Sequence, residues 1–177
     1  LLGASLGRPP HSLCFVANAY GKPALADTEG LHFNLSHCRD MALIGLSRAA
    51  PLGVDVERIR PLPDRDALIA HCFSRAEQAW LSCQPPASQE WDFFRLWTAK
   101  EAVLKALGSG LATPLESISI RLPEAGGEHA TVDGAGSPWT LFSTRSDPDH
   151  IIATGIRTQL SPGRIRQFHL VGDKTSA

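Results

Sequence analysis

The 177-residue sequence lacks several features that would assign it to a common class. No apolar run approaches the length of a membrane-spanning helix. The opening "LLGASLGRPP" has neither a basic leader nor the long apolar core of a secretory signal. The formal net charge is -1, so the chain as a whole is not attracted to polyanions or membranes. We therefore expect a cytoplasmic protein that binds neither nucleic acid nor a membrane.

Motifs for metal clusters, nucleotides and serine hydrolysis are also missing. The four cysteines form no C-x-x-C pair, so a zinc site is not indicated, and a chain of this size does not need disulfides. The sequence contains no P-loop, no G-x-G-x-x-G and no G-x-S-x-G. We expect reduced thiols and a site built in some other way.

Hydrophobic periodicity predicts strands, then helices, then strands again. A period of two, or a short apolar run, predicts the first strands, at 13–17, 31–36, 41–46 and 52–57. A period of 3.6 predicts the helices, at 64–72, 74–83 and 89–107, the last ended by Gly108 in a left-handed conformation. Strands return at 115–122, 139–144, 151–156 and 165–170, with 126–136 as a loop. This order is typical of an α+β protein.

Two carboxylates stand side by side on the predicted strand 52–57. Asp55 and Glu57 are two residues apart, so they project from the same face, while Leu52, Val54 and Val56 form the other. Adjacent buried carboxylates repel each other unless a cation lies between them, and Mg²⁺ prefers such oxygen ligands. A solvated strand end would tolerate the same acids, and the spacing alone leaves both interpretations open.

The predicted helix 89–107 places a lysine among apolar residues. Lys100 falls on the face formed by Phe93, Leu96, Val103 and their neighbours. Its ammonium could reach past the core to solvent, or could bind a phosphate at the margin of the core. Glu101 and Lys105 have the spacing of a surface ion pair, but this helix has little polar surface.

Other polar residues give weaker signals. The stretch "SRAE" predicts a capping box between Ser74 and Glu77. Ser36 and His37 end the predicted strand 31–36, and His37 suits either a phosphate donor or a turn. Lys22 lies in a loop, where a lysine is usually solvated. Together with the acids, these cations suit a phosphorylated ligand held through Mg²⁺.

The order of five motifs resembles the 4′-phosphopantetheinyl transferases of the larger, surfactin-synthetase class. These motifs are "YGKP", "HFNLSH", "GVDVE", "FSRAE" and "WTAKEAVLKALGSGL", within residues 1–120. The resemblance implies two similar α+β halves related by a pseudo-twofold axis. Each half would be an antiparallel sheet packed with a helix, and the active site would lie in the cleft between them. We expect residues 1–50 to form the N-terminal half, lacking its first segment, and 51–177 the C-terminal half.

The resemblance also implies an activity and roles for single residues. Such enzymes transfer 4′-phosphopantetheine from coenzyme A to a serine of an apo acyl or peptidyl carrier protein. They need Mg²⁺ and release adenosine 3′,5′-bisphosphate, and we expect a monomer. The family motifs match the metal acids to Asp55, Glu57 and Glu101, with Glu101 and Lys105 catalytic. They match coenzyme A binding to Lys22, Ser36, His37, Lys100 and Lys105, and supporting roles to Glu77 and Trp97.

Two other functions fit the same residues less well. A non-catalytic module that binds coenzyme A or a carrier protein would have no need for all three of Asp55, Glu57 and Glu101. A metal-dependent phosphate hydrolase would need a positioned water, and no motif here supplies a hydrolase arrangement.

Overall fold

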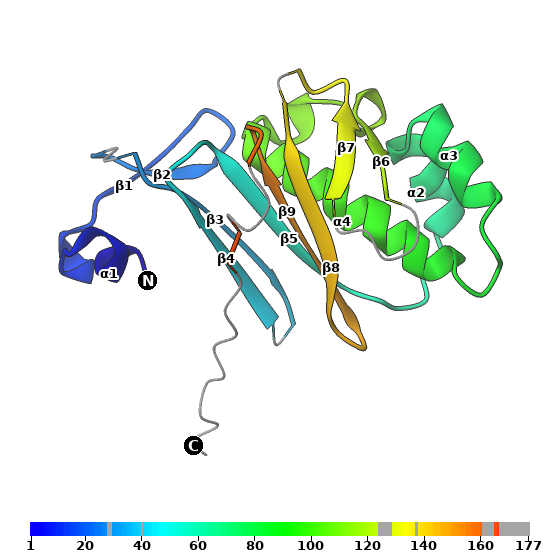
Figure 1. The fold of residues 1–177 in the computed structure, drawn as a ribbon, viewed down its shortest axis with the longest axis horizontal. Helices are drawn as coiled ribbons and strands as arrows, with labels where there is room; N and C mark the ends of the chain where they lie inside the picture. The colour runs from blue at the N-terminus through cyan, green and yellow to red at the C-terminus, as the bar shows by residue number, and fades with distance from the viewer. Residues whose placement is uncertain (28–29, 40, 124–128, 137, 161–164, 167–177) are drawn as a thin grey trace, which may run out of the picture.

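A five-stranded antiparallel sheet and one long helix form the centre of the structure. It is a computed structural model that describes residues 1–27, 30–39, 41–123, 129–136, 138–160 and 165–166. The strands are ordered β5–β9–β8–β7–β6, namely β5 (Leu52–Arg58), β6 (Ser119–Arg121), β7 (His129–Asp133), β8 (Thr140–Asp147) and β9 (His150–Ile156). Helix α4 (Gln89–Leu107) lies along one face of this sheet (Figure 1). The expected α+β class with an antiparallel sheet packed against a helix is therefore confirmed.

Glycines on the sheet let α4 approach closely. Gly53 of β5 and Gly155 of β9 are register partners, and both face Ala102 of α4. A Cβ atom on Gly53 would lie 2.1 Å from the Ala102 carbonyl oxygen, so no larger residue fits there. The close approach sets the residues of β5 directly against the side chains of α4. It also fixes which face of β5 each residue occupies, because side chains alternate along a strand.

The helices begin and end close to their predicted positions. α2 (Arg65–Cys72) and α3 (Arg75–Ser82) lie at one end of the molecule, beside the start of α4 (Figure 1). α3 opens with the predicted capping box, in which the Ser74 hydroxyl accepts from the Glu77 N–H and the Glu77 carboxylate accepts from the Ser74 N–H. Gly108 ends α4 with φ 71°, as predicted. No described helix is long and apolar enough to cross a membrane.

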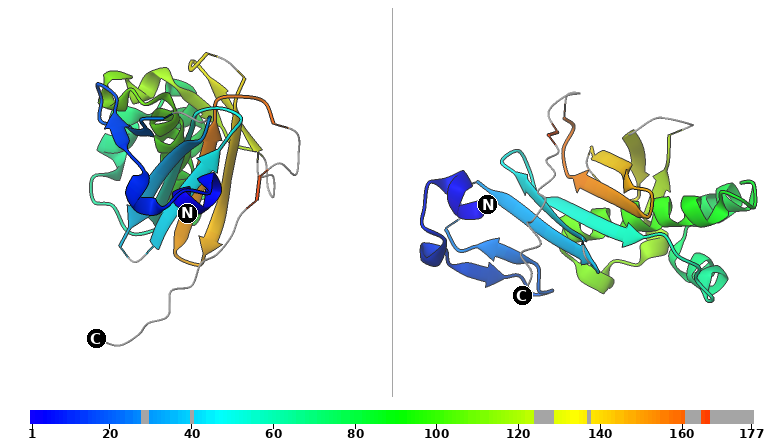
Figure 2. Two further views of the ribbon diagram at one scale, coloured as in Figure 1. Left: turned by 90° about the vertical axis from the view of Figure 1, so that its left-hand side faces the viewer. Right: turned by 90° about the horizontal axis from the view of Figure 1, so that it is seen from below.

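Residues before β5 form two hairpins at the other end of the molecule. Helix α1 (Leu2–Leu6) and the 3₁₀ turn η1 (Pro10–Ser12) precede β1 (Phe15–Ala17), which pairs with β2 (Pro23–Leu25). β3 (His32–Cys38) and β4 (Met41–Ser47) form the second hairpin, which lies beside β5 (Figure 2). The long helix packs on the sheet of residues 51–177. A twofold relation between that part and residues 1–50, and the boundary at residue 50, stay predictions.

The β3 strand turns its polar face inward and its apolar face outward. Asn34 Oδ1 accepts a hydrogen bond from the Val54 N–H at 2.8 Å, and Ser36 Oγ accepts one from the Val56 N–H at 3.3 Å. Side chains of β3 thus satisfy the free edge of β5. On the outer face, Leu35 is 51% exposed and its partner Ile44 is 46% exposed. The expectation of a buried strand at 41–46 is wrong for this reason.

Three further segments differ from the sequence predictions or lie outside what is described. The predicted loop 126–136 contains strand β7, which pairs with β6 and β8. In the predicted strand 115–122, the first residues form the 3₁₀ turn η3 (Leu115–Ser117) and only Ser119–Arg121 are strand. A second 3₁₀ turn, η2 (Gly110–Ala112), follows α4. Most of the predicted strand 165–170 lies outside the described residues.

Candidate active site

Acidic and basic side chains meet between β5 and the second half of α4. Asp55 and Glu57 project from the same face of β5 as Gly53, which is the face against α4. Asp55 is only 4% exposed, and Glu57 is half-buried. Glu101 and Lys105, one turn apart on α4, complete the group. The structure therefore brings together the three predicted metal acids and the predicted catalytic lysine, Lys105.

The side chains of Asp55, Lys105 and Ser36 form a triangle of hydrogen bonds. Lys105 Nζ donates to Asp55 Oδ1 at 2.6 Å and to Ser36 Oγ at 2.9 Å. The Ser36 hydroxyl in turn donates to Asp55 Oδ1 at 2.9 Å. The second carboxylate oxygen, Asp55 Oδ2, is buried and has no partner among the described residues. A buried anionic oxygen left unpaired is costly, so it is a natural position for a further cation or donor.

The three carboxylates repel one another. The pKa of Glu101 is raised by burial first and then by the charges of Asp55 and Glu57, while Lys105 acts in the opposite direction. Burial and the Asp55 charge likewise raise the pKa of Glu57, against a hydrogen bond that Trp97 Nε1 donates to it at 3.2 Å. Trp97 itself is held by stacking on Phe93. A cation placed among these acids would relieve their mutual repulsion.

The acids do not form a closed metal cage. Among the described residues, no group of three or more His, Cys, Asp or Glu side chains is close enough together to hold a metal ion. Mg²⁺ usually takes only one or two carboxylates from the protein and keeps waters or phosphate oxygens as its other ligands. The unpaired Asp55 Oδ2 and the raised pKa values of Glu57 and Glu101 fit an open site of this kind.

A cavity of about 300 Å³ opens beside this group. One wall is the loop from Tyr20 to Pro23, and the other is the C-terminal half of α4 with Glu101 and Lys105. Asn34 of β3 also lines it, so strand, loop and helix each contribute. An elongated ligand in this cavity would reach the acids at one side and the exposed ring of Tyr20 at the other.

The loop wall of the cavity is fastened to the end of α4. Asn18 Nδ2 donates to the Gly108 carbonyl at 2.7 Å, while Asn18 Oδ1 accepts from the N–H groups of Tyr20 and Lys22. Lys22 Nζ donates to the carbonyls of Leu52 and Ala106 at 3.0 and 2.9 Å. Lys22 therefore ties loop, strand and helix together, and has one N–H left for a ligand. Burial lowers its pKa to about 8.

The structure does not bring Lys100 to the acids. Its side chain is 0% exposed, and Nζ donates to Glu77 Oε2 at 2.7 Å and to the Ile118 carbonyl. Burial lowers the pKa of Lys100, and the hydrogen bond and charge of Glu77 oppose this. Glu77 also accepts from the Ile120 N–H at 2.7 Å, so this pair joins α3, α4 and β6. Lys100 neither extends to solvent nor lies where a phosphate could reach it, so we do not assign it to a phosphate.

The remaining predicted residues divide between the site and the surface. Ser36 is buried within the Asp55 triangle rather than open to a nucleotide. His37 lies on the outer face of β3 and is exposed, so the structure does not bring it to the acids. Asn18 and Asn34 were not predicted as site residues. The alternation in "HFNLS" placed Asn34 beside Ser36 and could have found it, whereas nothing in the loop sequence signals the contact of Asn18 with Gly108.

The fold and this group define the class of protein to which the chain is related. The model of the 4′-phosphopantetheinyl transferase superfamily matches residues 51–155, which include β5, α4 and all three acids. The chain belongs to this superfamily. A holo-(acyl-carrier-protein) synthase from Bacillus anthracis, solved in complex with CoA (3′,5′-ADP), has a similar fold. The TM-score is 0.52 at 15% identity, and the match covers 60% of this chain and 94% of that one.

Curated relatives carry the same family name. The 4′-phosphopantetheinyl transferase HetI of Nostoc sp. is 36% identical over 159 residues, which is 88% of this chain and 65% of HetI. The 4′-phosphopantetheinyl transferase Sfp of Bacillus subtilis is 31% identical over 139 residues, 78% of this chain and 61% of Sfp. The chain thus spans less than two thirds of the length of these relatives. The predicted family is confirmed.

Proposed function

We propose that the protein transfers 4′-phosphopantetheine from coenzyme A to a serine of an apo acyl or peptidyl carrier protein. The observation that carries this proposal is the meeting of Asp55, Glu57, Glu101 and Lys105 between β5 and α4, where Glu101 and Lys105 also line the cavity beside the 20–23 loop. Membership of the superfamily supports the same activity. The proposed products are the holo carrier protein and adenosine 3′,5′-bisphosphate.

Mg²⁺ is the metal that these residues would hold. One or two carboxylates from among Asp55, Glu57 and Glu101 would be its protein ligands, together with oxygens of the diphosphate. Bound there, it would offset negative charge on the phosphate oxygens, which is the main catalytic requirement of phosphoryl transfer. The mutual repulsion of the acids and the unpaired Asp55 Oδ2 support this assignment.

The chain's own residues have separate parts in the reaction. The carrier serine oxygen forms a bond to the β-phosphorus of coenzyme A, and the bond from that phosphorus to the leaving bisphosphate oxygen breaks. Glu101, directly or through a water, accepts the serine proton. Lys105 supplies a positive charge beside the same phosphates. Lys22 and the exposed Tyr20 would hold the nucleotide end in the cavity, and His37 is assigned to a coenzyme A phosphate on the family motif alone.

Mass spectrometry of a carrier protein tests the activity. The protein is incubated with coenzyme A, Mg²⁺ and a panel of apo carriers, and transfer adds the mass of one phosphopantetheine. Asp55→Asn should slow transfer by orders of magnitude, whereas Asp133→Asn, at the end of β7 with a side chain 63% exposed, should not. Binding of coenzyme A without any mass gain would instead make the protein a non-catalytic module. Transfer by Asp55→Asn at the wild-type rate would remove the metal assignment.

The finer properties of the protein belong to the same proposal. We infer a cytoplasmic monomer that acts on carriers of fatty-acid, polyketide or non-ribosomal peptide synthesis and binds neither nucleic acid nor a membrane. The net charge of -1 supports the last point. The panel of carriers identifies the pathway, and light scattering measures the oligomeric state.

A further inference from the structure

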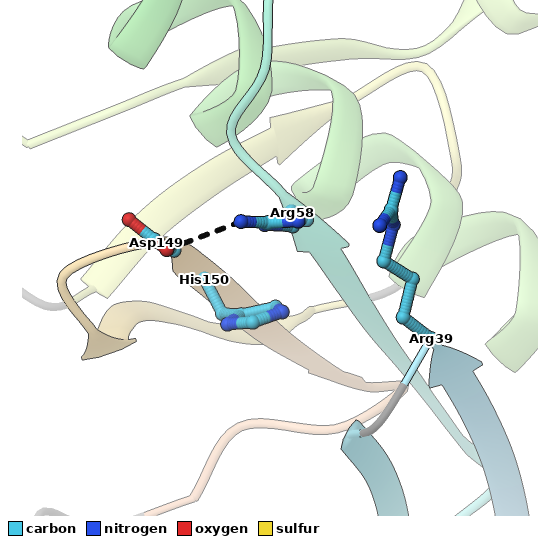
Figure 3. Close-up of a pocket in the computed structure, with 4 residues that line it drawn as sticks. All are labelled: Arg39, Arg58, Asp149 and His150. Atoms are coloured by element: carbon cyan, nitrogen blue, oxygen red, sulfur yellow. Dashed lines mark hydrogen bonds and ion pairs between the residues drawn. The ribbon is translucent and has the colours of Figure 1, made fainter.

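A second cavity lies on the opposite side of β5 from the acids. Its volume is about 480 Å³, and it is lined by Arg39, Arg58, Asp149 and His150 (Figure 3). Arg58 and His150 are register partners in β5 and β9. Glu57 points toward α4, so its neighbour Arg58 points away from α4. The thickness of the sheet therefore separates this cavity from the candidate active site.

Three cationic or donor side chains reach the cavity from three segments. Arg58 comes from the end of β5, His150 from the start of β9, and Arg39 from the turn between β3 and β4. The His150 ring lies between Asp149 on one side and Arg39 on the other, with its far nitrogen on the Arg39 side (Figure 3). Arg39 is exposed and makes no ion pair with any described residue. Asp149 bonds Arg58 at 3.4 Å, but its side chain is 62% exposed and free to turn outward.

His150 holds an unused nitrogen at this place. The residue is 7% exposed, and Nδ1 lies 2.9 Å from Asp147 Oδ1. A carboxylate only accepts hydrogen bonds, so Nδ1 is the protonated nitrogen and its ring is held in one orientation. Nε2 is buried and has no partner among the residues that the structure describes. Buried polar nitrogens normally have a partner, so a missing ligand atom is a direct explanation.

The backbone of Arg39 is also unusual. Its φ is 52°, and it is the one residue other than glycine with a positive φ among those described. The left-handed conformation is unfavourable for a residue with a Cβ, and a glycine would fit the same turn without strain. A non-glycine residue in this strained conformation points to a use for its side chain, here the guanidinium.

We propose that Arg39, Arg58 and His150 form a binding site for a phosphate group. Two guanidiniums present paired N–H donors to phosphate oxygens, and this is the ligand geometry that arginine suits best. His150 Nε2 completes the site, either by accepting from a protonated phosphate oxygen or by donating when the ring is protonated. The sheet separates this site from the acids, and phosphate binding here does not depend on the transfer reaction.

Nuclear magnetic resonance of the histidine rings tests the site directly. The protein is titrated with inorganic phosphate and, separately, with O-phosphoserine, while NaCl keeps the ionic strength constant. The His150 ring signals, identified by their loss in His150→Gln, should shift and saturate. Tighter binding of phosphoserine than of free phosphate would identify the ligand as a phosphomonoester, and the reverse order as the free ion.

Two variants and one control make the result decisive. Arg39→Gly and His150→Gln should each weaken phosphate binding on the order of tenfold, as expected for the loss of one charged hydrogen bond. Arg39→Gly should keep or raise the melting temperature, because glycine accepts the backbone conformation of Arg39. Arg121→Gln removes an equal charge from a side chain that is 79% exposed, and should not affect binding. The proposal is overturned if chloride reproduces the shifts, if no saturation occurs, or if Arg39→Gly binds phosphate like the wild type.

Discussion

Replacing Lys100 with methionine should destabilise the protein strongly and leave coenzyme A binding unchanged. The Lys100 and Glu77 side chains are 0% and 1% exposed and lie 2.7 Å apart. Methionine fills the apolar part of the lysine site but leaves the Glu77 carboxylate buried without its cation. Breaking a buried pair in this way costs about 3–5 kcal/mol. For a domain of this size the melting temperature would fall by roughly 6–20 °C.

Calorimetry and kinetics together separate this structural role from a role in binding phosphate. If Lys100 held a phosphate, Lys100→Met would raise the KM for coenzyme A by about tenfold or more, with little loss of stability. The double variant Lys100→Met, Glu77→Gln should be more stable than Lys100→Met alone, because it leaves no buried charge while an amide oxygen still accepts from the Ile120 N–H. An unchanged melting temperature in Lys100→Met, with a raised KM, would refute the structural account.

Three further variants test the neighbourhood of the site. Because Glu101 has a raised pKa, its ionisation lowers the stability of the fold as pH rises through that pKa. Glu101→Gln should therefore melt at a higher temperature than the wild type at neutral pH without Mg²⁺, while transfer is lost. A lower melting temperature would contradict the repulsion among the three acids. Asn18→Ala frees the 20–23 loop from Gly108 and should raise the KM for coenzyme A with kcat little changed. Asn18→Asp keeps the Oδ1 acceptor and should raise this KM less. Steady-state kinetics that show only a fall in kcat would exclude a positioning role for Asn18. Gly53→Ala should lower the free energy of unfolding by about 1–3 kcal/mol or more, because its Cβ would overlap the Ala102 carbonyl. The Cβ of Gly155→Ala would lie 3.5 Å from its nearest neighbours, so this variant should lose much less. Chemical denaturation measures both values.

Local patterns predicted the helices and the acids well. The capping box at Ser74 and the glycine at position 108 marked helix ends that the structure confirms. The two-residue spacing of Asp55 and Glu57 correctly placed both on one face of a strand. These features depend on neighbours within a few residues, so the chain itself carries the information.

Long-range pairing could not be predicted in the same way. Alternation in β3 showed that Leu35 and Ser36 face opposite sides, but not which side is buried, because that depends on the free edge of β5 nearby. The partner of Lys100 is 23 residues away, and periodicity alone left solvent or a phosphate as the choices. Strand β7 escaped prediction because its alternation is short, with Ala130 and Val132 as its apolar residues, and it stands between glycine-rich segments that indicate a loop.

The capped edge of β5 affects how copies of the protein meet one another. An edge strand with free N–H groups can add a strand from another molecule, which is a common first step in aggregation. In β5 the N–H groups of Val54 and Val56 are already bonded to Asn34 and Ser36, so a foreign strand would find these two donors already used. β3 thus closes this part of the β5 edge to intermolecular pairing through its side chains, without forming a ladder of backbone hydrogen bonds with β5. Glu101 and Lys105 still line the cavity beside the 20–23 loop, so closing this edge of β5 leaves that cavity open.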